Sequence, residues 1–269
     1  FWVDYLTAFR NITRQYRRSL LGIAAVTFGV MALILAAGFI EWIFWATREG
    51  AIQSGLGHIH VVQAGYLENG TADPMRYLLP ASSEVSRAIE HFPRVRTIAR
   101  RLSFNGIASH GDSTISFIAE GMDPEAEAIV SHFLNITAVG ENLSSGAPNG
   151  IMLGRGLAEN LGVGVGDTVV LMATTRGGGI NAVEATVRGL FTSASKAYDD
   201  SALRVPMPLA ERLLRVSGSH RWILALDDTA HTTETLQALR EKFSDSGLEF
   251  VPWYDLADFY KKTAALLSR

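Results

Sequence analysis

The sequence has 269 residues, of which 48% are hydrophobic, and it carries a formal net charge of −3 at pH 7. This length is enough for one large domain or two small ones with a sizeable core. The weakly negative charge argues against nucleic-acid binding. Because the chain contains no cysteine, it has no disulfide framework, no thiolate nucleophile and no zinc–cysteine site.

The first long apolar segment, residues 19–40, carries no charged side chain. At 1.5 Å per residue it would form a helix of about 33 Å, longer than a hydrocarbon core of roughly 30 Å. A signal peptide, whose apolar region spans roughly 7–15 residues, and the buried helix of a soluble protein are the alternatives. We therefore predict a membrane-spanning helix with an outer aromatic rim over residues 19–45.

Basic residues precede this segment, whereas Glu41 follows it. The positive-inside rule then predicts a cytoplasmic N-terminus and a larger domain outside. Within residues 1–18, apolar side chains recur at spacings of three and four beside a basic stripe, which indicates an amphipathic helix at the membrane surface. Packing of that helix on other cytoplasmic protein is the alternative. The basic residues are Arg10, Arg14, Arg17 and Arg18.

Small residues alternate by three and four along the predicted span. They are Gly22, Ala25, Gly29, Ala32 and Ala36. Because small side chains let a second helix approach closely, we interpret them as a packing face for a neighbouring membrane helix. Beyond them, "FIEWIFW" is typical of an interfacial aromatic belt.

The remaining residues alternate short strands with short helices, which predicts an α+β domain of two lobes. Residues 46–105 and 219–253 would form a discontinuous lobe next to the membrane, and residues 106–218 an inserted distal lobe. Residues 254–269 are expected to form a stalk leading back toward the membrane. Both ends of the sequence are typical of edges within a longer polypeptide, so we expect the chain to stop before a second membrane helix.

Residues 151–173 predict a strand, a helix, a glycine-rich turn and a second strand, and residues 174–182 a hairpin loop. The glycines resemble a nucleotide-binding loop only at first sight. The sequence has no G-x-x-x-x-G-K-[ST], and Glu159 stands where G-x-G-x-x-G requires its third glycine. We interpret these glycines as a tight corner between helix and strand.

No catalytic constellation is visible, since G-x-S-x-G and H-E-x-x-H are both missing. His58 and His60 lie two apart in a predicted strand at 57–66, so both should point to one side of it. We expect them to face solvent, with half of a metal site as the alternative. The acidic pairs at 199–200 and 227–228 are interpreted as solvated turn residues.

Three segments together match a known family: "AFRNITRQYRRS", "GHIHVV" and "IMLGRGLAENLGVGVGDTVVLMA" with the later "ATVRGLFTSA". They resemble the FtsX-like, MacB and lipoprotein-releasing permease superfamily of bacterial ABC transporters. The most specific element is a G-x-x-L-A-x-x-L-G-V-x-x-G-D block, to which we assign a structural role. Its residues are Gly154, Leu157, Ala158, Leu161, Gly162, Val163, Gly166 and Asp167.

The resemblance implies a permease in the bacterial inner membrane, with a cytoplasmic N-terminus and a periplasmic main domain. ATP and Mg²⁺ would bind to a separate or fused ABC ATPase subunit, and this chain would hold no cofactor and catalyse no reaction itself. The implied partners are that ATPase, a second permease copy or paralogue, membrane lipid and a periplasmic or outer-membrane protein.

Members of this superfamily release lipoproteins, drive efflux or regulate cell-wall hydrolases. By analogy with the lipoprotein-releasing permeases, the outer end of the helix would contact acyl chains, and an ordinary aromatic belt is the alternative. The candidate residues are Phe39, Ile40, Trp42, Ile43, Phe44 and Trp45.

The resemblance therefore implies extraction or export of a lipoprotein, lipid or amphiphile, driven by cytoplasmic ATP hydrolysis. Mechanical efflux of a soluble substrate and regulation of a periplasmic enzyme are the alternatives. In one lipoprotein-releasing permease, a longer hairpin captures a periplasmic chaperone. The loop at 174–182 is short and glycine-rich, so we do not expect such a hook on this chain.

Overall fold

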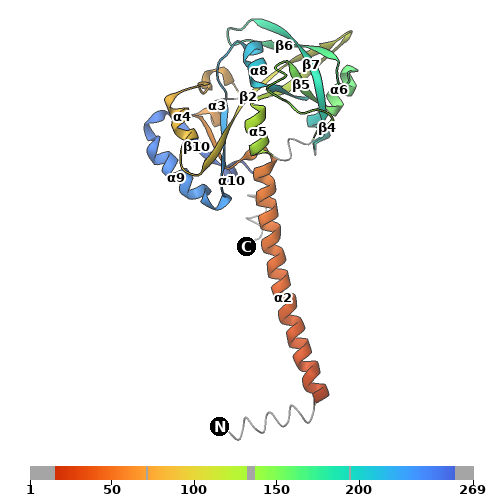
Figure 1. Ribbon diagram of the computed structural model, residues 1–269, viewed down its shortest axis with the longest axis vertical. Helices are drawn as coiled ribbons and strands as arrows, with labels where there is room; N and C mark the ends of the chain where they lie inside the picture. Colours follow the sequence, from red (N-terminus) through yellow and green to blue (C-terminus); the bar gives the residue numbers. More distant parts are fainter. Residues whose placement is uncertain (1–15, 71, 132–136, 194, 258–269) are drawn as a thin grey trace. The chain divides into compact units, whose positions relative to one another are not determined.

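The computed structural model describes residues 16–70, 72–131, 137–193 and 195–257 (Figure 1). The chain divides into two compact units, Phe1–Arg48 and Glu49–Arg269, of which the second is called the outer domain below. Arg17 and Arg18 lie in the first turn of the helix α2 (Tyr16–Ala51). Arg10, Arg14, most of the predicted surface helix and most of the predicted stalk lie outside the described residues.

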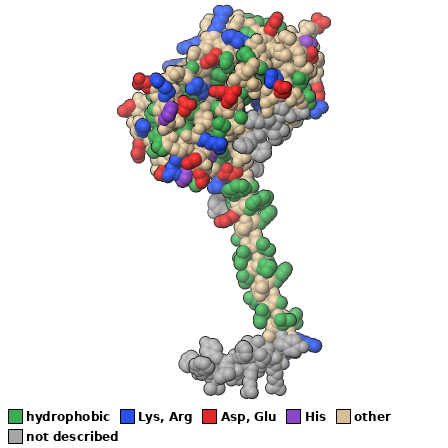
Figure 2. All heavy atoms as spheres, viewed as in Figure 1, with side chains coloured by type: hydrophobic (Ala, Val, Ile, Leu, Met, Phe, Trp, Pro, Cys, Tyr) green, Lys and Arg blue, Asp and Glu red, His purple; other side chains and the backbone are tan. Residues whose placement is uncertain are grey.

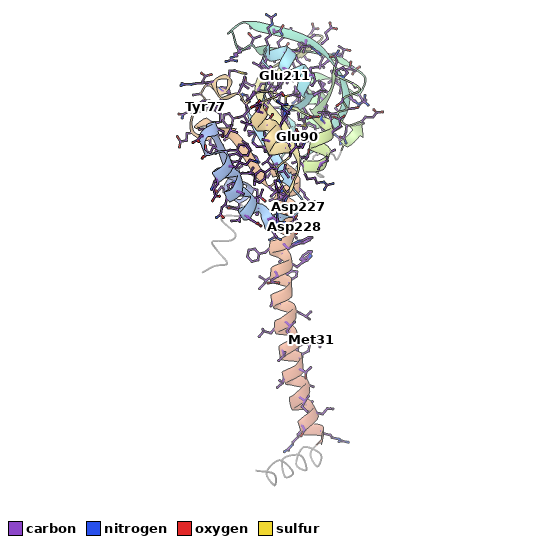
Figure 3. The ribbon with its side chains drawn as sticks, turned by 60° about the vertical axis from the view of Figure 1, so that its left-hand side comes forward. Met31, Tyr77, Glu90, Glu211, Asp227 and Asp228 are labelled. Atoms are coloured by element: carbon purple, nitrogen blue, oxygen red, sulfur yellow. The ribbon has the colours of Figure 1, made fainter. Side chains whose placement is uncertain are left out.

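The helix α2 contains 36 residues and is therefore about 54 Å long at 1.5 Å per residue. The segment Arg17–Leu56 is long and apolar enough to cross a membrane, and none of its most apolar window is buried. Figure 2 shows apolar side chains along its length, and Met31 is one of them (Figure 3). Such a surface is suited to a lipid environment, because water would solvate it poorly.

The described strands of the outer domain form one ten-stranded sheet. Its order is β10-β1-β9-β2-β3-β8-β5-β7-β4, with β6 pairing with β2 and β7. Most pairs are antiparallel, whereas β3–β8 and β5–β7 are parallel. The strands are β1 (Ile59–Gln63), β2 (Val95–His110), β3 (Ser113–Met122), β4 (Thr137–Gly140), β5 (Gly150–Gly154), β6 (Thr168–Thr174), β7 (Ile180–Phe191), β8 (Ala202–Pro206), β9 (Arg221–Leu226) and β10 (Leu248–Pro252).

Short helices connect these strands, and their ends follow local chemistry. Ser83 and Ser86 form a reciprocal capping box at the start of α4, and Gly162 ends α6 at a φ of 71°. The helical segments are η1 (Ile52–Leu56), α3 (Tyr66–Asn69), η2 (Pro74–Tyr77), α4 (Glu84–Glu90), α5 (Pro124–Val130), α6 (Arg155–Leu161), α7 (Lys196–Asp199), α8 (Met207–Leu214), η3 (Thr229–His231), α9 (Thr232–Lys242), η4 (Ser244–Ser246) and α10 (Trp253–Leu256).

The elements predicted for the middle of the chain are confirmed. β5, α6 and β6 follow one another as expected, and β6 pairs with β7 from Thr168↔Thr186 to Thr174↔Ile180 around the predicted hairpin loop. The helix α5 begins at Pro124, with Asp123 as its N-cap residue.

Two large apolar clusters fill the outer domain. The first, which we call core A, gathers residues such as Leu157, Leu171 and Leu203 around α6, α8 and β5–β8. The second, core B, gathers residues such as Ile59, Trp222 and Leu236 around α4, α9 and β1, β9 and β10. β2 contributes to both, because Leu102 and Ala108 belong to core A and Ile98 to core B. This strand also runs without a break across the predicted lobe boundary at 105–106.

Two expectations about polar residues are wrong. His58 and His60 are buried, with 8% and 3% exposure, because β1 lies between β10 and β9 and is covered on both faces. Asp199 is also buried, and its two carboxylate oxygens accept the backbone N–H of Ser193 at 3.0 Å. The 227–228 pair does lie exposed in the turn after β9 (Figure 3).

Candidate functional site

The small-residue positions of α2 share one narrow face. At 3.6 residues per turn, the five positions from Gly22 to Ala36 fall within about 80° of the helix circumference. No atom of another described segment lies within 4 Å of a Cβ built at Gly22 or Gly29. The geometry therefore leaves room for a second backbone along this face, which remains a prediction.

The aromatic rim has a different geometry. Residues 39–45 cover almost two helical turns, so their side chains point around the whole helix rather than to one side. Phe39 and Trp42 stack with ring centroids 6.1 Å apart, and Trp45 is 55% exposed. Phe44 is half-buried. A ring of this kind is suited to a membrane interface on every side, and its contact with acyl chains remains a prediction.

The glycine-rich family block lies within core A. Leu157, Ala158 and Leu161 are buried on α6, and the Oδ2 atom of Asp167 accepts the N–H of Gly164 at 2.8 Å. Gly166 has a φ of 99°, a conformation that favours glycine. These contacts shape the corner between α6 and β6.

The first residue of this block, Gly154, lies too close to a neighbouring segment to carry a side chain. A Cβ at this position would collide with the carbonyl oxygen of Asp199, so the end of β5 can pass close to α7 only without a side chain. Asp199 in turn anchors the loop before α7 through Ser193. The block therefore positions the end of β5 against α7, which lies about forty residues later in the chain.

A buried ion-pair network lies at the centre of the sheet and was not predicted from the sequence. Arg101 of β2 donates two hydrogen bonds to Glu127 of α5, and both side chains are less than 10% exposed. Its Nη1 atom also lies 3.9 Å from Glu120 of β3. Arg221 of β9 donates to Glu120 at 2.6 Å and to Ser103 at 3.2 Å. The network thus joins α5 to three strands.

The charges in this network determine its protonation state. Burial acts to raise the pKa of Glu120, but Arg101, Arg221 and Arg204 outweigh this effect and hold that pKa below its usual value. Glu120 is therefore ionised at neutral pH. A buried pair of this kind is sensitive to loss of one partner, because the other charge is then left without compensation.

The buried histidines belong to the junction between η1 and the sheet. His60 donates from Nε2 to the carbonyl oxygen of Leu56 at 2.6 Å, and burial together with Arg221 lowers its pKa to about 3. His58 accepts the N–H of Leu226 at 3.1 Å, and burial lowers its pKa as well. Neutral histidines therefore serve here as structural hydrogen-bonding groups. Within the described residues, no set of side chains is arranged to hold a metal ion.

Sequence reasoning missed the ion-pair network because its members are far apart in the chain. One signal was present. Arg101 and Ser103 alternate within β2, and Ser103 is the register partner of Glu120, so polar residues recur on one face of a predicted strand pair. Their partner Glu127 sits on a separate helix, which a strand pattern does not indicate.

Solved structures of low sequence identity share this fold. The extracellular domain of the noncanonic ABC-type transporter YknZ from Gram-positive bacteria has 11% identity and a TM-score of 0.53, over 72% of this chain and 100% of that one. The periplasmic region of MacB from Actinobacillus actinomycetemcomitans has 11% identity and a TM-score of 0.52, over 78% and 94%. No curated protein sequence matches significantly.

The family model supplies the assignment. The MacB-like periplasmic core domain matches residues 19–242, which is most of the chain and includes the apolar part of α2. This match supports a transporter role for the protein as part of an ABC-type permease. The chain belongs to the MacB-like periplasmic core domain family.

Proposed function

We propose that this chain supplies the first membrane helix and the outer domain of an ABC transporter permease in a bacterial inner membrane. A cytoplasmic ATPase subunit would bind ATP and Mg²⁺, and its motion would reach the outer domain through α2. The transported substrate would be a lipoprotein, lipid or amphiphile. A second permease copy or paralogue would pack against the small-residue face of α2.

The proposal is supported mainly by α2, which is one uninterrupted helix from Tyr16 to Ala51. It combines a narrow face of small residues with an aromatic ring near its outer end and leads directly into η1 at Ile52. η1 ends at Leu56, and β1 begins three residues later at Ile59. Two residues, Gly57 and His58, therefore separate η1 from β1.

Hydrogen bonds inside the outer domain link η1 to the sheet through α5. The hydroxyl of Ser131, just after α5, donates to the carbonyl oxygen of Gln53 in η1 at 3.2 Å. One turn earlier, Glu127 of α5 binds Arg101 of β2. A displacement of η1 would therefore act on the centre of the sheet through one short helix, which supports a mechanical role for this junction.

The substrate half of the proposal can be tested by photo-crosslinking in cells. A crosslinking amino acid would replace Trp42 or Trp45, and the control would carry it at Ile180, which is 80% exposed on the β6–β7 hairpin. We expect lipidated substrate to be captured at both tryptophan positions during ATP turnover and not at the control. Capture of a soluble substrate would favour efflux, and capture of phospholipid alone would reduce the ring to a membrane belt.

A further inference from the structure

The outer domain contains a cavity of about 540 Å³, lined by residues of α3, η2, β2, β3, β6, α7 and α8. Ser103, Phe104 and Asn105 of β2 form part of its wall. On the edge of β2 opposite β3, β9 pairs as far as Arg101 and β6 pairs from Ile107. Among the described strands, none covers residues 102–106 on this edge. The cavity therefore lies at a fork in the sheet and has the size of a small-molecule site.

One part of the lining is apolar. It contains Leu67, Met75, Phe104 and Leu214, and Met75 and Phe104 are only partly buried against core A. Leu67 and Ile118 remain 45% and 47% exposed. Contact with an apolar ligand body would remove this surface from water.

The other part of the lining is polar. Ser103 is the register partner of Glu120, so both lie on one face of the sheet. Tyr66 and Tyr198 approach Glu120 from α3 and α7. Burial raises the pKa of both phenols, which therefore stay neutral hydrogen-bonding groups. Tyr66 is held in place by stacking on His220, with ring centroids 5.6 Å apart.

The charges around Glu120 select the kind of polar group that fits. An anionic ligand group would meet the ionised carboxylate of Glu120. A cationic group would compete with Arg221, which binds that carboxylate at 2.6 Å, and with Arg101 at 3.9 Å. A carboxylate has about four acceptor positions, so a neutral O–H or N–H can bond to it while these pairs stay intact.

We propose that this cavity binds a small uncharged amphiphile. Its hydroxyl or amide end meets Glu120, Tyr66 and Tyr198, and its apolar body lies against Met75 and Leu67. This inference rests on the outer domain alone and is independent of the transported substrate.

Single-cysteine labelling tests the proposal, because the chain has no cysteine of its own. Thr174→Cys places a thiol on the cavity wall, and Val165→Cys places the control at a position that is 45% exposed in the turn after α6, outside the cavity lining. The full chain in lipid nanodiscs would be labelled with a maleimide in the presence of hexyl-β-D-glucoside, hexanoate or hexylamine. These probes share one apolar chain and differ in the charge of their polar end.

We expect the glucoside to slow labelling at position 174 about fivefold when its concentration is four times its dissociation constant. Labelling at position 165 should be unchanged, and the two charged probes should have little effect at either position. Leu67→Ser, at a half-exposed position outside the ion-pair network, should weaken the protection while the circular dichroism spectrum is unchanged. Absence of protection by the glucoside would overturn the site, and equal protection by a charged probe would overturn the ligand class.

Discussion

The helix α2 and the sheet of the outer domain distribute apolar and charged side chains in opposite ways. On α2, large apolar residues such as Phe28 and Leu33 are 76% and 72% exposed. In the outer domain, Arg101 and Glu127 are only 6% and 2% exposed. The helix exposes large apolar side chains of the kind that the outer domain buries. The outer domain, in contrast, buries paired charged side chains, whereas the middle of the helix has none.

Because of this difference, different kinds of residue determine which segments pack together in the two regions. In a lipid bilayer, apolar contacts would be alike on all sides of α2, so the small residues would distinguish one face from another. In the outer domain, paired charges fix which segments meet, because a buried charge without its partner is strongly unfavourable. Substitutions should therefore affect assembly in the first region and folding in the second.

The largest effect is expected for Glu127→Leu, which leaves Arg101 buried without its bidentate partner. The free energy of unfolding should fall by about 4 kcal/mol. Chemical denaturation of the full chain in nanodiscs, followed by tryptophan fluorescence, measures this change. Glu159→Leu is the matched control, because Glu159 pairs with Arg155 at a site where both side chains are more than 60% exposed. The control should lose less than about 0.5 kcal/mol, and similar losses for both variants would contradict a role for burial.

A smaller effect is expected in core A, where Leu157 of the family block is fully buried. Leu157→Ala should reduce the free energy of unfolding by about 3 kcal/mol through lost burial and a residual cavity. Val165→Ala, at a position 45% exposed in the following turn, should change it little. If both substitutions had the same small effect in thermal unfolding, the block would not belong to a packed core.

The pH dependence of stability tests the buried histidines. The pKa of His60 is lowered to about 3 in the folded protein, against 6.5 for an unperturbed side chain, so the unfolded chain binds the proton more readily. Stability is therefore complete above pH 6.5 and falls as the pH drops toward 3, by about 2 kcal/mol between pH 7 and pH 5. His60→Gln keeps a donor for Leu56 without titrating, and its unfolding curves at these two pH values should differ less. An unchanged slope would mean that His60 is not buried as a neutral group.

The smallest effect is expected on α2 and concerns association. Gly29→Leu should block the small-residue face and weaken pairing with a second helix by roughly 1 kcal/mol, or about fivefold. Gly38→Leu makes the same change on the opposite side of the helix. Disulfide-trapping or energy-transfer measurements of the assembled transporter would report the difference. Loss of assembly in both variants would show that helix bulk, and not one face, matters.

The helix α2 can be predicted from sequence more fully than the contacts inside the outer domain. The span, its small-residue face and the β5–α6–β6 corner depend on residues close together in the chain, and local patterns predict their placement on helices and strands. His58 and His60 show the limit. Alternation predicted an exposed face, but β1 is covered on both faces by segments that local sequence does not identify.

The candidate sites show this limit more strongly. The contact between Arg101 and Glu127 and the cavity beside Glu120 both depend on how the sheet is ordered. That order includes the parallel pairing of β3 with β8, which joins strands separated by about eighty residues. A single sequence carries no local signal for such a pairing.

The length of the strand β2 affects how the outer domain can unfold locally. Its 16 residues contribute side chains to core A at one end and to core B at the other. Neither core can detach as a separate cooperative unit without breaking hydrogen bonds that also stabilise the other. Amide hydrogens of β2 that bond to neighbouring strands should therefore exchange only in the slowest, global opening event, and a force applied at η1 would reach both cores through a single backbone.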